Sequence, residues 1–323
     1  MRNCKIDPPG VEVSKEIKQG RVLIVGSINT DLVVRSPHLP RCGETIEGTG
    51  FLQVAGGKGA NQAVAAARIG ASVAMIACLG TDVNGDLRRK DLEAEGIDCT
   101  GVERVSTKPS GIAIVTVSDD GQNTIVLVAG SNGELTSSVV ERHEAAIEAA
   151  DVVVCQLETP GESVYTTLKL ARRLGKVTVL NPAPATGPLP AELIALVDYL
   201  VPNEVEISIL SGMPVASESG ARRAAAELLQ AGARNVIVTL GAQGAYLLPE
   251  GGADGTLFPA PQVRAVDTTA AGDTFIGVFA AQIAAAQTPE FSISLALRAA
   301  SFSVTRAGAQ PSIPTLSEVE AVS

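Results

Sequence analysis

Four stretches decide the fold: VVVCQLE (residues 152–158), VTVLNPAPA (residues 177–185), YLVPNEVE (residues 199–206) and VIVTLGAQG (residues 236–244). Each begins as a short apolar run and ends in polar or glycine residues. Helical sequence precedes the first run, at about residues 137–149, and separates later runs at about residues 162–174 and 220–230. Such alternation is typical of parallel strands joined by helices that cover both faces of a sheet. We predict an α/β fold with a doubly wound, mostly parallel sheet.

The same pattern extends toward the N-terminus. RVLIVG (residues 21–26) reads as a buried strand and is followed by SINTD, which carries Asn29 and Asp31. Ligand sites in open α/β sheets form beyond the carboxyl ends of strands, so these polar ends predict one shared cleft. Asp31 is a candidate acceptor for sugar hydroxyls, with a plain turn residue as the alternative. The dinucleotide fingerprint G-x-G-x-x-G is absent at this turn.

A glycine-rich loop, GGKGAN (residues 56–61), opens a helix of small residues. Its backbone can approach a polar ligand closely, and Lys58 and Asn61 favour a binding role over plain loop punctuation. It differs from a Walker A loop because Gly59, rather than Ser or Thr, follows Lys58.

Two β-rich runs flank Asp119-Asp120-Gly121-Gln122, which is a hairpin signal. Both faces of this hairpin are apolar, so one face can cover a ligand while the other needs a partner. We predict a small β-sheet lid built from segments at about residues 32–54 and 100–130. We also predict a homodimer that forms through the lids.

The stretch DTTAAGD (residues 267–273) precedes an apolar, buried helix at residues 274–286. Small residues at a helix N-terminus suit an anion, and a carboxylate beside a bound phosphate can accept a proton from a hydroxyl. Asp273 is therefore a candidate general base, with a simple helix cap as the alternative. Asn203 and Glu206 likewise have a capping-box spacing, and Glu158 is open to interpretation as a surface loop residue.

Composition limits the possible partners and location. The 323 residues carry a formal net charge of −10, which argues against nucleic-acid and anionic-membrane partners. Five widely spaced cysteines indicate free thiols, and we find neither a signal peptide nor a membrane-spanning run. We predict a cytoplasmic enzyme with a flexible extension at residues 1–20 and one α/β domain at residues 21–323.

The motifs GSINTD, GGKGANQAVAAARIGA, QLE, NPAPA, PNEVE, TLGAQGA, AVDTTAAGD and VTRAGAQPS occur in this order. Together they resemble the ribokinase family of carbohydrate and nucleoside kinases, from about Arg21 to Ser312. The resemblance implies the doubly wound fold, the lid and the lid-to-lid dimer. It also implies ATP as co-substrate, Mg²⁺, and a monovalent cation, typically K⁺.

Site roles follow from the resemblance, motif by motif. Asp273 resembles the general base, with the N–H groups around Ala270, Ala271 and Gly272 as the anion hole. The sugar-contacting set is Asn29, Asp31, Gly57, Lys58, Gly59, Ala60, Asn61, Glu158 and Asp273. The nucleotide set is Asn203, Glu206, Thr239, Leu240, Gly241, Ala242, Gln243, Gly244 and Gly272, with Glu206 acting on Mg²⁺ through water. The cation loop comprises Asp267, Thr269, Ser303, Arg306, Gly308 and Ser312.

The implied activity is ATP-dependent phosphorylation of the 5-hydroxyl of D-ribose. Deoxyribose, another small sugar or a nucleoside are alternative acceptors within the same family. A non-catalytic sugar- or nucleotide-binding protein is the alternative from another class, and Asp273 argues against it. Only two histidines are present, His38 and His143, and they lie outside the motifs, which disfavours histidine-based chemistry. Protein-kinase signatures are missing as well.

Overall fold

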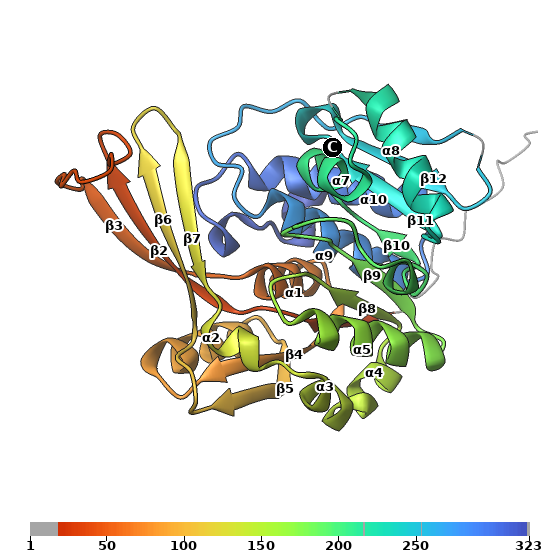
Figure 1. The fold of residues 1–323 in the computed structure, drawn as a ribbon, viewed down its shortest axis with the longest axis horizontal. Helices are drawn as coiled ribbons and strands as arrows, with labels where there is room; N and C mark the ends of the chain where they lie inside the picture. The colour runs from red at the N-terminus through yellow and green to blue at the C-terminus, as the bar shows by residue number, and fades with distance from the viewer. Residues whose placement is uncertain (1–18, 216, 253, 322–323) are drawn as a thin grey trace, which may run out of the picture.

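The computed structural model describes residues 19–215, 217–252 and 254–321, so residues 1–18 of the predicted extension lie outside the described residues. The chain forms one large and one small sheet (Figure 1). The strands of the large sheet, in spatial order, are β13 (Thr256–Phe258), β12 (Ala245–Pro249), β11 (Asn235–Thr239), β10 (Tyr199–Leu200), β9 (Val177–Leu180), β8 (Val152–Cys155), β1 (Arg21–Val25), β4 (Ser72–Gly80) and β5 (Asp98–Val105).

The large sheet is parallel from β11 to β5, and β12 and β13 extend it as antiparallel strands. Its central strands are mostly apolar because both faces are covered: all four residues of β8 are buried. This confirms the predicted doubly wound, mostly parallel sheet. Two hydrophobic cores lie on its two faces.

Helices cover each face. One core includes residues of α1 (Lys58–Arg68), α2 (Val83–Ala94), α9 (Ala271–Ala284), α10 (Pro289–Ser303) and α11 (Leu316–Ala321). The other includes residues of α3 (Ser137–Arg142), α4 (Glu144–Ala149), α5 (Gly161–Arg173), α6 (Ala191–Ile194), α7 (Glu204–Ser211) and α8 (Glu218–Gln230). Short 3₁₀ turns are η1 (Gly130–Glu134), η2 (Gly241–Gln243) and η3 (Gln310–Ser312).

One predicted helix, at residues 137–149, is two helices. His143 ends α3 and begins α4 with φ −108° and ψ 24°, which lies outside the helical region. Its ring Nε2 lies 3.1 Å from Oε1 of Glu103 on β5. A single-residue break of this kind leaves the apolar periodicity almost unchanged, so the sequence pattern does not reveal it.

The small sheet projects from the α/β body and is on the left of Figure 1. Its strand order is β3 (Gly50–Gly56), β2 (Asn29–Ser36), β6 (Gly111–Ser118) and β7 (Asn123–Val128). The predicted hairpin is β6–β7, and β2 pairs with β6 in parallel. The expected second segment, 100–130, extends too far toward the N-terminus, because β5 pairs with β4 in the large sheet.

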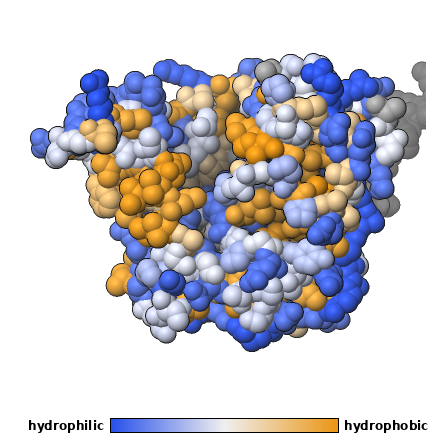
Figure 2. Space-filling model, viewed as in Figure 1, coloured by the Kyte–Doolittle hydropathy of each residue, from blue (hydrophilic) through white to orange (hydrophobic). Residues whose placement is uncertain are grey.

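The register divides the small sheet into two faces, since directly paired residues share a face and neighbours along a strand alternate. The site face carries Asp31, Val54, Ala113 and Leu127, together with Val33, Leu52, Val115 and Ile125. The outer face carries Leu32, Gln53, Ile114 and Val126, together with Val34, Phe51, Thr116 and Thr124. Figure 2 shows the apolar surface over β6 and β7.

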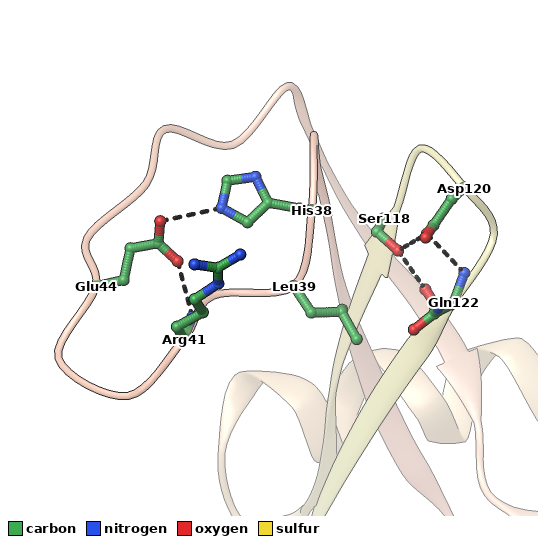
Figure 3. A pocket seen from close by; sticks show the side chains of 7 residues that line it. All are labelled: His38, Leu39, Arg41, Glu44, Ser118, Asp120 and Gln122. Carbon is green, nitrogen blue, oxygen red and sulfur yellow. Dashed lines mark hydrogen bonds and ion pairs between the residues drawn. The ribbon is translucent and has the colours of Figure 1, made fainter.

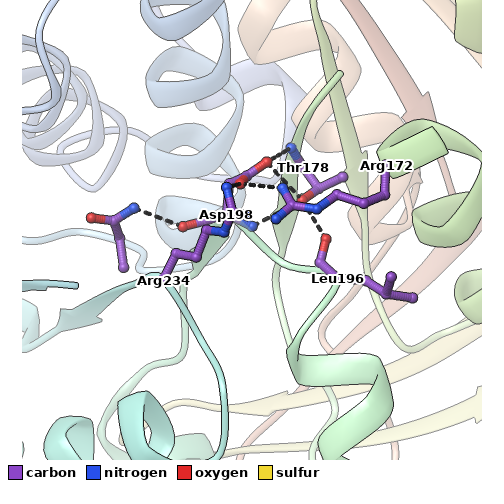
Figure 4. A network of polar contacts seen from close by, with 6 residues as sticks. Arg172, Thr178, Leu196, Asp198 and Arg234 are labelled. Atoms are coloured by element: carbon purple, nitrogen blue, oxygen red, sulfur yellow. Dashed lines mark hydrogen bonds and ion pairs between the residues drawn. The ribbon is translucent and has the colours of Figure 1, made fainter. Parts of the chain in front are cut away.

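A polar network holds the amino-terminal ends of β9, β10 and β11, at the edge opposite the predicted cleft (Figure 4). The Asp198 carboxylate pairs with Arg172 at 2.6 Å and with Arg234 at 3.2 Å. It also accepts hydrogen bonds from the N–H and hydroxyl of Thr178. We interpret this network as structural, because its groups satisfy one another.

Helices α1 and α9 pack unusually closely. A Cβ atom at Gly277 would lie 2.3 Å from the carbonyl oxygen of Gln62 and 2.6 Å from Cβ of Ala65. Only glycine therefore allows this approach, which brings the first turns of the two helices within hydrogen-bonding distance.

We expect Gly277→Ala to lower the free energy of unfolding by about 1–3 kcal/mol, the usual cost of overpacking. The gain in helix propensity, about 1 kcal/mol, is too small to offset a backbone clash of this kind. Urea denaturation measures the change. Gly220→Ala on α8 is the matched control, because its Cβ would make only ordinary contacts, the shortest being 3.4 Å. Equal effects of the two substitutions would contradict the close-packing argument.

Candidate active site

Asp273 lies in the first turn of α9 and is 7% exposed. Ala270 caps the helix in the left-handed region, with φ 59°. The helix has no side-chain cap among the described residues, and the N–H of Ala271 donates to the Thr268 carbonyl at 3.3 Å. The next N–H groups, of Gly272 and Asp273, cannot bond within the helix and remain available to an anion. Asp273 therefore does not act as the N-cap residue.

The Asp273 carboxylate accepts one hydrogen bond on each oxygen from α1. Asn61 Nδ2 donates to Oδ2 at 2.9 Å, and Gln62 Nε2 donates to Oδ1 at 3.0 Å. Two charge-assisted bonds fix the plane of the carboxylate and leave a lone pair on each oxygen. Asn61 Oδ1 is buried and has no partner among the described residues, so it is available to a ligand hydroxyl.

Glu158, predicted at a strand end, lies beside the glycine-rich loop and not on a surface loop. It accepts from Ser27 Oγ at 2.6 Å and from the N–H of Lys58 at 3.2 Å. The N–H groups of Gly59 and Ala60 donate to Ser27 Oγ and to the Ser27 carbonyl. Gly59 and Ala60 therefore shape the loop, whereas Lys58 and Asn61 carry its polar side chains. Gly57 is the residue that caps α1.

Asn29 and Asp31 lie on β2, so the turn interpretation of Asp31 is wrong. Asn29 Oδ1 accepts from Nδ2 of the buried Asn132 at 2.7 Å. Asn132 in turn accepts from the N–H of Ile28 at 2.9 Å, which holds the Asn29 amide in one orientation.

Neighbouring carboxylates raise the pKa of Asp31 and stabilise the positive charge of Lys58. Burial, followed by the charges of Glu158 and Asp273, raises the pKa of Asp31 to about 6 against the opposing effect of Arg88. Burial lowers the pKa of Lys58, but three nearby carboxylates have a larger, opposite effect. The pKa of Lys58 therefore lies above its usual value. These carboxylates belong to Asp273, Glu158 and Glu206.

We expect Asp31→Asn to stabilise the protein at neutral pH. The folded-state pKa, about 6, exceeds the ordinary value of 3.8, so ionised Asp31 destabilises the fold fully above about pH 6. The destabilisation fades as pH falls and vanishes below the unfolded-state pKa. Melting temperatures between pH 4 and pH 8 check this: the variant should gain most at high pH. A pH-independent difference would contradict the expectation.

A cavity of about 420 Å³ lies next to Gly272, and most of its wall is apolar. Of the predicted nucleotide set, its lining includes Asn203, Thr239, Gly241, Ala242, Gly244 and Gly272. Leu240 instead packs in the core, and Gln243 is exposed and outside the lining. The loop at residues 260–268 and the α10 residues Leu297, Ala300 and Ser301 complete the wall, which sequence patterns did not reveal.

Asn203 and Glu206 form the capping box that their spacing predicts. Glu206 N–H donates to Asn203 Oδ1, and Asn203 N–H donates to Glu206 Oε2, both at 2.8 Å. Burial raises the pKa of Glu206, although the Asn203 N–H and Lys58 oppose the shift. The second carboxylate oxygen, Oε1, is not used by the capping box.

The predicted cation loop brings two distant segments together. Asp267 Oδ1 accepts from the N–H and hydroxyl of Thr269, and its Oδ2 accepts from Gly308 N–H at 2.8 Å. The hydroxyls of Ser303 and Ser312 donate to the carbonyls of Ala300 and Ala309. The Arg306 guanidinium pairs with Glu318 at 2.7 Å, so only its backbone is suited to a cation.

A second hollow, of about 440 Å³, lies at the tip of the small sheet (Figure 3). Three of its four charged side chains have partners: His38 Nε2 lies 3.1 Å from Glu44 Oε1, and Asp120 accepts from Ser118. None of its residues belongs to a predicted site.

The described chain was also searched for disulfides, clusters of metal ligands and membrane-spanning helices. Its four cysteines, Cys42, Cys78, Cys99 and Cys155, are free thiols, whereas Cys4 lies outside the described residues. Among the described residues, we find no group of three or more His, Cys, Asp or Glu side chains that could hold a metal ion. No helix among the described residues has the length and hydropathy to span a membrane.

Comparisons with known proteins agree with this geometry. Residues 19–316 match the pfkB family carbohydrate kinases. A ribokinase of Haemophilus influenzae is 42% identical over 91% of this chain and 95% of its own length. A deoxyribokinase of Salmonella typhi is 37% identical over 92% and 96%. The structure of an Arabidopsis thaliana ribokinase complexed with ribose and ATP superposes with a TM-score of 0.88, at 32% identity, and covers 94% of this chain and 98% of that chain. The predicted resemblance is confirmed: the chain belongs to the pfkB family of carbohydrate kinases.

Proposed function

We propose that this carbohydrate kinase transfers the γ-phosphoryl group of ATP to the 5-hydroxyl of D-ribose. The observation that carries the proposal is the position of Asp273. Its carboxylate is bonded to the sugar-side residue Asn61, while the adjacent Gly272 lines the apolar cavity suited to a nucleotide. The similarity to ribokinases, one of them with ribose and ATP bound, supports the choice of both substrates.

In this proposal Asp273 accepts the proton of the sugar hydroxyl as its oxygen bonds to the γ-phosphorus. The bond between that phosphorus and the β–γ bridging oxygen breaks, and ADP leaves. The free N–H groups at the start of α9 stabilise the charge on the transferring group. Lys58 keeps its ammonium charge among the carboxylates and offsets their repulsion of the phosphates.

Ribose binds between β2 and α1 in the proposed complex. Hydrogen-bond donors and acceptors surround that position, from the side chains of Asn29, Asp31, Lys58, Asn61 and Glu158. Deoxyribose remains the nearest alternative acceptor, because a deoxyribokinase is nearly as similar as the ribokinases are. An ADP-release assay over ribose, deoxyribose, other pentoses and nucleosides tests the proposal. Ribose should give the highest kcat/KM, and a better deoxyribose or nucleoside would overturn the substrate assignment.

Oxygen atoms of the site are suited to hold the two proposed metal ions, Mg²⁺ and K⁺. Mg²⁺ would neutralise charge on the phosphates, and Glu206 Oε1, which the capping box does not use, would hold its water shell. For K⁺, the backbone carbonyls of the loop and the Asp267 carboxylate are hard oxygen ligands, and the bond from Gly308 N–H keeps the two segments adjacent. Removal of K⁺ should lower activity without removing nucleotide binding.

The small sheet acts as the lid, since its site face carries Asp31. A lid excludes water, which otherwise competes with the sugar as phosphoryl acceptor. Its outer face is unsuited to solvent: Phe51 is 62% exposed and Val126 is 59% exposed. We propose that a second copy of this chain covers the outer face as a homodimer. Free thiols further support a cytoplasmic location.

We expect Val126→Glu to convert a dimer into a monomer, because it places a charge in the apolar outer face. Light scattering coupled to gel filtration at micromolar concentration measures this. Phe291→Glu is the matched control, since Phe291 is an exposed aromatic residue on α10, away from the small sheet. A monomeric wild-type protein, or dissociation by both substitutions, would contradict the lid-to-lid dimer.

A further inference from the structure

The second donor to Asp273, Gln62, belongs to neither predicted ligand-contacting set. Its side chain is fully buried, so it cannot contact a sugar or a nucleotide. Gln62 Nε2 donates to Asp273 Oδ1 at 3.0 Å and lies 3.4 Å from Asn181 Oδ1. Gln62 can therefore affect the reacting groups only through its hydrogen bond to the carboxylate of Asp273.

A second buried amide determines which end of the Gln62 side chain faces Asp273. Gln156 Nε2 donates to Gln62 Oε1 at 2.6 Å. Since that oxygen is held by a donor, the Gln62 amide group presents N–H to the carboxylate. A reversed Gln62 amide would place its oxygen against Asp273 Oδ1 and leave two acceptors facing each other without a proton.

The absence of a side chain at Gly26 leaves the space that the Gln156 amide occupies. A Cβ atom at Gly26 would lie 1.9 Å from Gln156 Oε1, so the amide lies directly against the end of β1. That oxygen has no hydrogen-bond donor among the described residues. Gln156 and Gln62 thus form a buried chain from the end of β8 to the carboxylate, and the glycine at position 277 allows α1 and α9 to complete it.

We propose that Gln62, oriented by Gln156, is the positioning residue that aligns the Asp273 carboxylate for proton transfer. This inference rests on the proposed function of Asp273 as general base. Asn61 holds the other oxygen but also faces the sugar, whereas Gln62 acts only on the base. Two bonds from adjacent residues of one helix turn define the carboxylate plane, and loss of one lets it rotate about its remaining bond.

The first test is Gln62→Met, which keeps the length of the side chain and removes both hydrogen-bonding groups. We expect kcat to fall between about 10- and 100-fold, the range for a small misplacement of a reacting group. The KM values for ribose and ATP should hardly change, because no ligand-contacting atom is removed. Thr167→Val is the matched control: it removes another fully buried hydrogen bond, from Thr167 Oγ1 to the Ser163 carbonyl, on α5.

The second test is Gln156→Met, which removes the donor to Gln62 Oε1 and introduces no charge, so it acts on Asp273 only through Gln62. Without that donor the Gln62 amide is free to reverse, so we expect kcat to fall, by no more than in Gln62→Met. In the Gln62→Met background, the Gln156→Met substitution should cost little more.

Three outcomes would overturn the inference: an unchanged kcat in Gln62→Met, a loss in Thr167→Val of the same size, or fully additive losses in the double variant. Nucleotide binding and melting temperature, measured on every variant, separate misfolding from misalignment. These outcomes differ from failure of the proposed function, in which the wild-type protein itself would phosphorylate no sugar.

Discussion

Asp273→Asn is expected to lower kcat by at least about 100-fold, the usual contribution of a positioned general base. The amide is nearly isosteric with the carboxylate but cannot accept the hydroxyl proton. It can also satisfy only one of the two donors, Asn61 and Gln62, that now bond to the two carboxylate oxygens. Steady-state kinetics with ribose and ATP measure the loss, and calorimetry should show that ribose still binds.

The matched control for this variant is Glu158→Gln. It makes the same chemical change in another carboxylate of the site, one that bonds to Ser27 and Lys58 rather than to the reacting groups. We expect it to raise the KM for ribose and to leave more of kcat intact. If Asp273→Asn retained nearly wild-type kcat, the assignment of the general base would be wrong.

Asp31→Ala is expected to weaken ribose binding by roughly 1.5–3 kcal/mol for each charged hydrogen bond that the sugar loses. This corresponds to a rise in Kd on the order of 10- to 150-fold. Asp31 lies on the site face of β2, and its raised pKa shows how little solvent stabilises its charge. A sugar hydroxyl that donates to it replaces that missing solvation.

Calorimetric titration with ribose at pH 7.5 measures the effect. Asp120→Ala, at the tip of the small sheet, removes a carboxylate far along the same lid and should leave ribose affinity unchanged. Because the Asp31 carboxyl titrates near pH 6, affinity in the wild-type protein should also decline as pH falls through this value. An affinity that Asp31→Ala does not change would mean that Asp31 takes no part in sugar binding.

The substitutions Asp31→Asn and Asp31→Ala connect substrate binding with stability. Asp31 is expected to destabilise the folded protein at neutral pH, whereas its removal costs substrate affinity. A buried carboxylate whose charge is poorly solvated until a ligand arrives is a common feature of functional sites. Lys58 is the opposite case, because the surrounding carboxylates outweigh burial and raise its pKa above the usual value.

Much of the fold follows from local pattern. The strand β9 at residues 177–180 coincides with the predicted run, because a short β-branched and apolar run between polar ends has few alternatives inside a parallel sheet. The hairpin β6–β7 follows from Asp-Gly between β-rich runs. The position of β5 was missed because its sequence, DCTGVERV, is neither continuously apolar nor regularly alternating.

The site was predictable to the extent that it lies at strand ends and in glycine-rich loops. Asn61, Glu158 and Asp273 come together from three distant segments, as the shared carboxyl edge of a parallel sheet requires. Gln62 belongs to the glycine-rich motif GGKGANQAVAAARIGA, and Gln156 begins the motif QLE. Their role depends on a helix crossing and on amide orientation, which no pattern along the chain encodes.

The nucleotide cavity shows the same limit. The segment at residues 260–268 has neither helical nor strand periodicity, and α10 reads as an ordinary buried helix. Only tertiary packing brings Val263 and Leu297 to one wall. Conversely, the capping box of Asn203 and Glu206 was predicted from spacing alone, because a cap is a local structure.

Phosphorus NMR of the product reveals which hydroxyl of ribose receives the phosphoryl group of ATP. The purified protein should convert ribose and ATP into ADP and a single sugar phosphate. In that product, the phosphorus should couple to the protons on carbon 5. A phosphorus coupled to the proton of another carbon, or free phosphate released from ATP with ribose unchanged, would contradict phosphorylation of the 5-hydroxyl.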